Sequence, residues 1–298
     1  MLTLDQVPWN RSKATSEFAY PAATWRLIID GEADGATNMA VDEAIMTSVR
    51  EGTSLPTLRL YAWSPPCLSL GRNQPLDDVD REACHAGGVD VVRRPTGGRA
   101  ILHVDELTYS LALLETDPRA AGGVLASYRR LSEGLLAGLD RLGVIATQAL
   151  GQRKAVADLT AICFDTPSDY EITVRHAGEP STGGRKLVGS AQWRARCGVL
   201  QHGSLPLHGD IARILGHLAL SDSEREVQRQ ALRARATTLE KARGRVIPFP
   251  HAAQAMTKGF SQALNLTFTR GTLTAQEQSL AIALRRERYA NQDWTART

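Results

Sequence analysis

The chain has 298 residues, of which 43% are hydrophobic and 22% charged, so it is long enough for one large catalytic domain with an appendage or for two medium domains. A formal net charge of +3 gives no case for bulk nucleic-acid binding, which usually requires a concentrated basic face. The four cysteines are sparse and unclustered, no apolar stretch approaches the ~18–20 residues of a membrane span, and the N-terminus lacks a signal-peptide core, so we expect a cytoplasmic protein with no metal site and no membrane contact.

The two ends of the chain differ in character from its middle. Residues 1–22 are polar and aperiodic, which predicts a flexible leader, and the apolar run at 27–29 predicts the first strand. Charged helical stretches dominate after residue 209. We therefore expect a catalytic domain over 23–245 and a C-terminal helical segment over 246–298 that packs on the same domain.

The segment 37–50 carries its apolar residues on one helical face, which predicts an amphipathic helix. Thr37 or Asn38 can cap the N-terminus of this helix. Asp42 and Glu43 suit its first turns, because carboxylates are favoured near the positive end of the helix dipole.

Short apolar runs separated by turn residues predict strands in both halves of the chain. Between them, leucines at helical spacing predict a helix over 127–142 that Gly143 ends. Strands and helices do not alternate regularly, so the fold class we expect is α+β, with a mixed, largely antiparallel sheet flanked by helices. The predicted strands, all expected in that one sheet, are 57–63, 67–70, 89–92, 99–102, 107–114, 170–174, 186–191 and 199–207.

The first segment that can carry chemistry is RRPTGGRAILH, which runs from Arg93 to His103. Gly97 and Gly98 allow positive φ and a close approach of a ligand to backbone N–H groups. Arg93 and Arg94 can hold a carboxylate or phosphate bidentately. On these residues alone, a plain hairpin turn with a solvated basic flank is the commoner meaning of such a segment.

Two further segments place polar residues at or on strands. Arg72 directly follows an apolar strand in SLGRNQP and can reach a ligand there, although a polar turn is the commoner explanation. His202 and Gly203 lie on a predicted strand, where His202 can line a pocket or be a hydrogen-bonded core histidine. The sequence contains no P-loop, dinucleotide fingerprint, metal-binding His pair or nucleophile-elbow serine, which removes several common enzyme classes.

A cysteine and a lysine are the sharpest catalytic candidates. Cys163 lies where an apolar run meets a loop, in LTAICFDTPSDYEI, and it can be a nucleophile or a small buried hydrophobe. Lys186 opens a strand that runs into Gly189, Ser190 and Ala191, and Gly189 permits a close backbone approach. Such a lysine is usually solvated, but beside a thiol its charge lowers the thiol pKa and creates a nucleophile. It can then carry protons between the thiol, the leaving thiol and an acceptor amine.

Nine segments in order make the chain resemble the biotin/lipoate protein ligase superfamily over about residues 25–294. Within it the chain is most similar to an octanoyltransferase branch of lipoate biosynthesis, because Cys163 occupies AICFDTPSDYEI, where the ATP-dependent lipoate ligases carry an Arg-Asn-Asp-type segment. The segments are NMAVDEAI, LRLYAWSPPCLSLGRNQ, VVRRPTGGRAILH, DELTYSL, the Cys163 segment, KLVGSAQ, LQHGSLPL, RATTLE and RERYANQDW.

This resemblance implies the catalytic-domain fold of the superfamily, with Cys163 as the acyl-thioester nucleophile and Lys186 as the lysine that activates it. It implies transfer of an octanoyl group from acyl-carrier protein to a lysine of a lipoyl-domain protein, of the glycine cleavage H protein or 2-oxoacid dehydrogenase E2 type. No cofactor is expected, since conversion of a thioester to an amide is downhill. The residues expected to bind substrate are Arg72, Arg93, Arg94, Gly97, Gly98, His103, Gly189, Ser190, Ala191, His202 and Gly203.

Two features depart from the pattern of that branch. The turn over 175–184 is long and can alter access to the site, and Asp169 stands where an aromatic residue is expected. Three alternatives remain open at this point. They are an ATP-dependent lipoate ligase and a lipoyl amidotransferase, both on the same fold, and a non-catalytic binding module in which Cys163 only fills the core.

Overall fold

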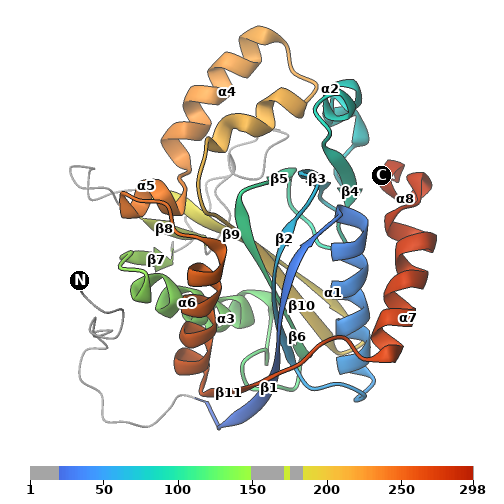
Figure 1. Cartoon of the computed structure of the whole chain (residues 1–298), viewed down its shortest axis with the longest axis vertical. Coiled ribbons are helices and arrows are strands. Elements are labelled where there is room, and N and C mark those ends of the chain that lie inside the picture. Colours follow the sequence, from blue (N-terminus) through green and yellow to red (C-terminus); the bar gives the residue numbers. More distant parts are fainter. Residues whose placement is uncertain (1–19, 149–170, 175–183, 298) are drawn as a thin grey trace.

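An eight-stranded sheet forms the centre of the computed structural model, which describes residues 20–148, 171–174 and 184–297 (Figure 1). The strand order is β11-β1-β2-β6-β10-β9-β8-β7. β1 pairs in parallel with β2 and β11, and the other neighbouring pairs are antiparallel, so the expected α+β class with a mixed, largely antiparallel sheet is confirmed. The strands are β1 (Ala23–Ala33), β2 (Thr57–Trp63), β6 (Glu106–Leu114), β7 (Ala146–Gln148), β8 (Ile172–Val174), β9 (Arg185–Ala195), β10 (Gly198–Pro206) and β11 (Leu266–Arg270).

Three of the predicted strands form a separate small sheet, so the prediction that all of them share one sheet is wrong. These are β3 (Cys67–Leu70), β4 (Asp90–Arg93) and β5 (Ile101–His103), in the order β4-β3-β5. Pro65 and Pro66 lie between β2 and β3. Because proline has no backbone N–H to donate, the ladder of β2 ends there and the chain starts a second sheet.

Helices cover both faces of the large sheet (Figure 1). Side chains alternate along β2, so that Leu58 and Leu60 enter the core under α3 and α6, whereas Tyr61 enters the core under α1. None of the described helices is both long and apolar enough to cross a membrane. The α-helices are α1 (Gly35–Arg50), α2 (Arg81–Ala86), α3 (Val124–Arg141), α4 (Asp222–Arg235), α5 (Leu239–Arg243), α6 (Phe249–Leu264), α7 (Ala275–Leu284) and α8 (Gln292–Ala296).

The two helices predicted most clearly from the sequence are confirmed as α1 and α3, but α1 has a different cap from the one expected. The Asp34 carboxylate accepts the Thr37 backbone N–H at 2.9 Å, so Asp34 is the N-cap. Asn38 is inside the helix, where its amide donates to the backbone of β1 and β2. At the end of α3, Gly143 has φ +72°, a conformation that favours glycine and stops the helix as predicted.

The C-terminal part of the chain contributes a strand as well as helices. β11 follows α6 and pairs in parallel with β1, with Ala23 opposite Leu266. This strand was not predicted from the sequence. Arg26 on β1 also binds Glu277 of α7, with Nη–Oε distances of 2.6 and 2.7 Å. The last helices are therefore tied to the first strand of the sheet.

Candidate active site

Lys186 lies in β9, which contains the strand predicted over 186–191 and pairs with β8 in the strand predicted over 170–174. β8 and β9 pair antiparallel with Thr173 opposite Lys186. The Lys186 Nζ donates to Glu171 Oε1 at 2.5 Å, and both side chains are buried. The Lys186 carbonyl accepts the Thr237 N–H at 2.9 Å. The lysine is therefore fixed at its backbone and at its ammonium group.

Cys163 lies outside the described residues, and so do Asp169 and the loop over 175–183. The expected contact between Cys163 and Lys186 therefore stays a prediction. The other cysteines are Cys67 and Cys84, which are buried, and Cys197, which is exposed. Burial raises the pKa of Cys67 well above its usual range and that of Cys84 to about 11, so neither thiol is an activated nucleophile.

The glycine-containing stretch after Lys186 faces β10 across the sheet. Ala191 is opposite His202 and Ser190 is opposite Gly203, so the two predicted segments adjoin. A Cβ on Gly203 would lie 2.5 Å from Ser190 Oγ and 2.6 Å from the Tyr109 ring, which leaves room for glycine alone. Ser190 Oγ hydrogen-bonds the buried Tyr109 hydroxyl at 2.6 Å.

The two turns that carry Arg72 and the paired glycines are packed against each other. A Cβ on Gly71 would lie 1.8 Å from the Gly98 carbonyl oxygen, so the backbones touch at this point. The Arg72 N–H donates to the Thr96 carbonyl at 2.9 Å, and the Arg72 side chain is exposed. Gly98 has φ +97°, which a side chain rarely adopts. Two motifs that looked independent in the sequence therefore make one double turn.

Arg93 and Arg94 are buried, and the hydrogen bonds of their guanidinium groups go largely to backbone carbonyls. These contacts support the double turn and, through Arg93, attach the C-terminus of the chain to it. Burial lowers the pKa of Arg93. The carbonyl partners of Arg93 are Gly71, Arg72, Gln74 and Thr295, and those of Arg94 are Ser69, Gly97 and Arg99.

His103 belongs to a buried hydrogen-bond chain behind that turn. Its Nδ1 lies 2.8 Å from Glu106 Oε1 and its Nε2 lies 2.7 Å from Ser69 Oγ, while its ring stacks on Trp63 at 4.0 Å between centroids. Glu106 also accepts the hydroxyls of Thr108 and Ser204. All of these side chains are buried, so the chain fixes the orientation of the imidazole.

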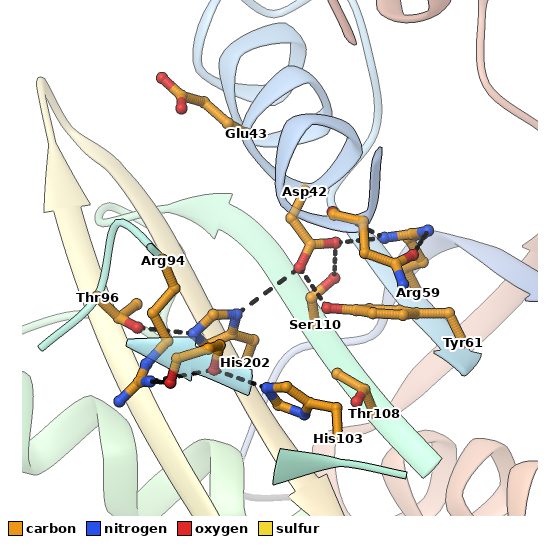
Figure 2. Close-up of polar contacts among 12 residues, drawn as sticks. Asp42, Glu43, Arg59, Tyr61, Arg94, Thr96, His103, Thr108, Ser110 and His202 are labelled. Carbon is orange, nitrogen blue, oxygen red and sulfur yellow. Dashed lines mark hydrogen bonds and ion pairs between the residues drawn. The ribbon is translucent and has the colours of Figure 1, made fainter. Parts of the chain in front are cut away.

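His202 connects the double turn to α1, as Figure 2 shows. Its Nε2 lies 2.7 Å from Thr96 Oγ1, and its Nδ1 lies 3.8 Å from an Asp42 carboxylate oxygen. Burial lowers the pKa of His202 and outweighs the opposing effect of Asp42, so the imidazole is neutral near pH 7. A neutral imidazole between a hydroxyl and a carboxylate positions these groups and carries no charge of its own.

Asp42 was interpreted from the sequence as a residue suited to the helix dipole, but it is the centre of a buried polar cluster (Figure 2). It accepts hydrogen bonds from Arg59, Tyr61 and Ser110, each at 2.8 Å. Burial alone would raise its pKa, but His202 and the Arg59 charge outweigh this effect and hold the pKa below its usual value. The sequence feature that could have identified this role is an acidic residue on the apolar face of a predicted amphipathic helix.

Within the described ranges, no group of three or more His, Cys, Asp and Glu side chains is placed to hold a metal ion. The chemically distinctive features of the described part are therefore the buried Lys186–Glu171 pair, the glycine-lined contact of β9 with β10, and the double turn supported by arginines.

Comparison with known sequences gives a consistent set of relatives. The sequence profile described as the lipoyl protein ligase A/B catalytic domain matches residues 34–261. Octanoyltransferase LipM of Symbiobacterium thermophilum is 43% identical over 281 residues, which cover 92% of this chain and 98% of that protein. Octanoyltransferase LipM of Moorella thermoacetica is 44% identical over 285 residues, which cover 93% of this chain and 99% of that protein.

Solved structures show the same architecture. A bi-partite lipoate protein ligase from Thermoplasma acidophilum, solved with its E2 lipoyl domain, superposes with a TM-score of 0.75 at 22% identity and covers 92% of this chain and 96% of its own. A lipoate-protein ligase A bound with ATP gives a TM-score of 0.72 at 24% identity, covering 92% of this chain and 99% of its own. At these identities the likeness is one of fold.

Proposed function

The chain belongs to the lipoyl protein ligase A/B catalytic domain family, and from this premise we propose that it is an octanoyltransferase that uses Cys163 as its nucleophile and Lys186 as the proton carrier beside it. The relatives named octanoyltransferases are 37–44% identical and align over nearly their whole length, so they support this activity over an ATP-dependent ligase or an amidotransferase.

One structural observation carries the assignment of the lysine. Lys186 is buried at the start of β9 and bound to Glu171 at 2.5 Å, whereas a lysine at a strand start is usually solvated. Even a paired buried ammonium group adds little stability compared with apolar residues of similar size, because desolvation offsets the attraction, so folding alone does not account for this position. A cation held at a fixed place supplies what an adjacent thiol needs to become a thiolate.

The proposed reaction has two acyl transfers. The Cys163 thiolate attacks the carbonyl of octanoyl-acyl-carrier protein, and the carrier leaves as a thiol. A lysine amine of a lipoyl-domain protein, of the glycine cleavage H protein or 2-oxoacid dehydrogenase E2 type, then attacks the acyl-enzyme and takes the octanoyl group as an amide. Backbone N–H groups at the Gly97–Gly98 turn or around Gly189 stabilise the oxyanion.

The remaining predicted binding residues fit two roles in this proposal. Arg72 is exposed at the edge of the double turn and meets substrate, whereas Arg93 and Arg94 hold the turn in shape. His103 and His202 act from behind that turn through fixed hydrogen bonds. A free thiolate requires a reducing compartment, so the proposal keeps the cytoplasmic location expected from the sequence.

The decisive experiment is intact-protein mass spectrometry after mixing with octanoyl-acyl-carrier protein, with and without ATP. We expect one octanoyl group on the wild type without ATP, and none on Cys163→Ser. Cys197→Ser is the matched control, since it removes an exposed thiol, and it should be acylated like the wild type. Acylation that needs ATP, or that survives in Cys163→Ser at the wild-type rate, rejects the proposal.

A further inference from the structure

Lys186 is an exception among the buried cations of this chain. In the described part, the cationic side chains that are buried are five arginines and this one lysine. The whole sequence contains thirty arginines and five lysines, so arginine is the residue that this chain ordinarily uses for a positive charge. Arginine stays protonated at any physiological pH, whereas a buried lysine can release its proton. The use of lysine at this buried position therefore indicates that its proton is transferred during the reaction.

The backbone around this lysine is also irregular. Ile172 is opposite Val188, but Thr173 is opposite Lys186, so Leu187 is an extra residue in β9. Such a bulge bends the strand and re-aims neighbouring side chains, and bulges are frequent next to active sites. Glu171 immediately precedes β8, at the level of this bulge. The bulge and the start of β8 together bring Lys186 Nζ to 2.5 Å from the Glu171 carboxylate.

We propose that Glu171 is the positioning residue of the acyl transfer: it holds the Lys186 ammonium charged and in place before each turnover and draws the proton back onto Lys186 at the end. This inference rests on the proposed function and adds to it a residue that neither the motifs nor the comparisons single out. Glu171 touches Lys186 and acts through it, so it is not itself a catalytic residue.

The proton balance shows what Glu171 contributes. In the first half, the Cys163 thiolate forms the new C–S bond, the carrier C–S bond breaks, and the leaving carrier thiolate takes a proton from Lys186. Lys186 is then neutral beside a buried carboxylate. In the second half, the acceptor amine forms the amide, the Cys163 thiolate is released, and the amine proton goes to Lys186. Because the nearby Glu171 carboxylate stabilises the ammonium form of Lys186, it favours this last proton transfer.

Among the described residues, the charged groups near Lys186 come from three elements. Glu171 precedes β8 and forms the ion pair. Arg185 is the neighbouring position on β9, and by strand alternation its side chain points to the opposite face. Arg235 ends α4 next to Ala236, which bridges to Lys186, and its side chain is exposed. Of these groups, the Glu171 carboxylate is the anion that stabilises the ammonium form.

The test measures the titration of Lys186 directly, by NMR of protein labelled with ¹³C at lysine Cε. With five lysines in the chain, five signals are expected, and the one missing in Lys186→Arg is that of Lys186. Glu171→Gln should lower the pKa of Lys186 by at least about one unit, since the partner charge is lost and burial remains. An unchanged Lys186 titration in Glu171→Gln overturns the proposal.

Two further variants keep the test interpretable. Glu277→Gln makes the same carboxylate-to-amide change in the buried pair with Arg26 and should leave the Lys186 titration as in the wild type. If Glu171→Gln does not fold, Glu171→Asp retains the charge and moves it away from Nζ. It should then lower the pKa of Lys186 by a smaller amount, and no change in that variant also overturns the proposal.

A second readout shows whether Glu171 acts through Lys186. In Glu171→Gln, the pH profile of Cys163 alkylation should move to higher pH, because Lys186 is less often charged. Direct loss of a nearby anion would move it to lower pH, which contradicts the proposal. Adding Glu171→Gln to Lys186→Met should have no further effect on the profile. The lysine titration needs neither Cys163 nor acyl substrate, so it stays interpretable even if no acyl-enzyme forms.

Discussion

The described part of the molecule contains two kinds of buried cation–carboxylate pair, and the contrast between them distinguishes a structural role from a catalytic one. Arg59 on β2 binds Asp42 on α1 at 2.8 Å, and Tyr61 and Ser110 donate to the same carboxylate. Lys186 on β9 binds Glu171 at 2.5 Å, beside a bulge at the end of the large sheet's hairpin. Similar distances therefore occur in two different surroundings.

The cation decides what each pair can do. The Arg59 guanidinium cannot release a proton and binds both α1 and β1 from its place on β2, so its pair with Asp42 fixes a helix on the sheet. The Lys186 ammonium is a single point charge that can lose a proton when a thiolate needs one. The Arg59–Asp42 pair is therefore a permanent structural contact, whereas the Lys186–Glu171 pair can change its charge when Lys186 loses its proton.

The largest expected effect concerns the permanent pair. Asp42→Ala leaves the Arg59 charge buried and removes the acceptor of two hydroxyls, so we expect a loss of about 3–5 kcal/mol in the free energy of unfolding. Urea denaturation measures it. Asp30→Ala, which removes the more exposed partner of Arg59, should cost clearly less. If Asp42→Ala is stable but inactive, Asp42 belongs to the chemistry and the contrast is wrong.

The next effect concerns the exchangeable pair. Lys186→Arg keeps a cation at the position that we propose to lie beside Cys163, but arginine cannot release a proton. We therefore expect Cys163 alkylation to be largely retained while octanoyl transfer falls about 100-fold or more, equivalent to about 2.7 kcal/mol. Steady-state transfer and alkylation are measured side by side. Lys241→Arg changes an exposed lysine and serves as the control. Wild-type turnover in Lys186→Arg would rule out a proton relay through Lys186.

A smaller effect is the pH dependence of stability that His202 adds to the region around Asp42. Its pKa is lowered in the folded state by burial, so it contributes stability that is complete above its unfolded pKa of about 6.5 and is lost as pH falls toward the folded pKa. His202→Gln should therefore show a flatter stability profile between about pH 7 and 5. Urea midpoints at several pH values measure it, and parallel profiles contradict it.

The smallest effect is expected for an exposed ion pair, which serves as a reference for the two buried pairs. Arg233 and Asp210 are also 2.5 Å apart, but their side chains are substantially exposed. Arg233→Gln should cost much less stability than Asp42→Ala, because solvent and salt screen such a pair. A hydrogen bond from Arg233 lowers the pKa of Asp210 to about 2, so this contribution exists above about pH 4 and disappears as pH falls toward 2. A loss of unfolding free energy as large as that of Asp42→Ala would mean that burial does not determine how much such a pair contributes to stability.

Local sequence patterns were sufficient for much of this protein. Helical spacing predicted α1 and α3, and alternation and turn residues predicted most of the strands, including the segments of β8 and β9 that carry Lys186 and its partner strand. Each of these signals lies within about 25 residues of chain, so periodicity and turn chemistry reveal it without knowledge of the partner. The family was indicated separately, by the resemblance of the nine ordered segments.

Tertiary structure decided what depends on distant partners. Pairing decided that β3 joins β4 and β5 instead of the large sheet, and it decided that β11 joins β1, although those two segments lie more than 200 residues apart in the chain. The same holds for Asp42, whose partners lie on β2, β6 and β10. Glu171 was visible only as one acid in a strand. Whether a buried carboxylate stabilises the fold or assists proton transfer depends on the cation that the fold places beside it, and a linear sequence pattern does not identify that neighbour.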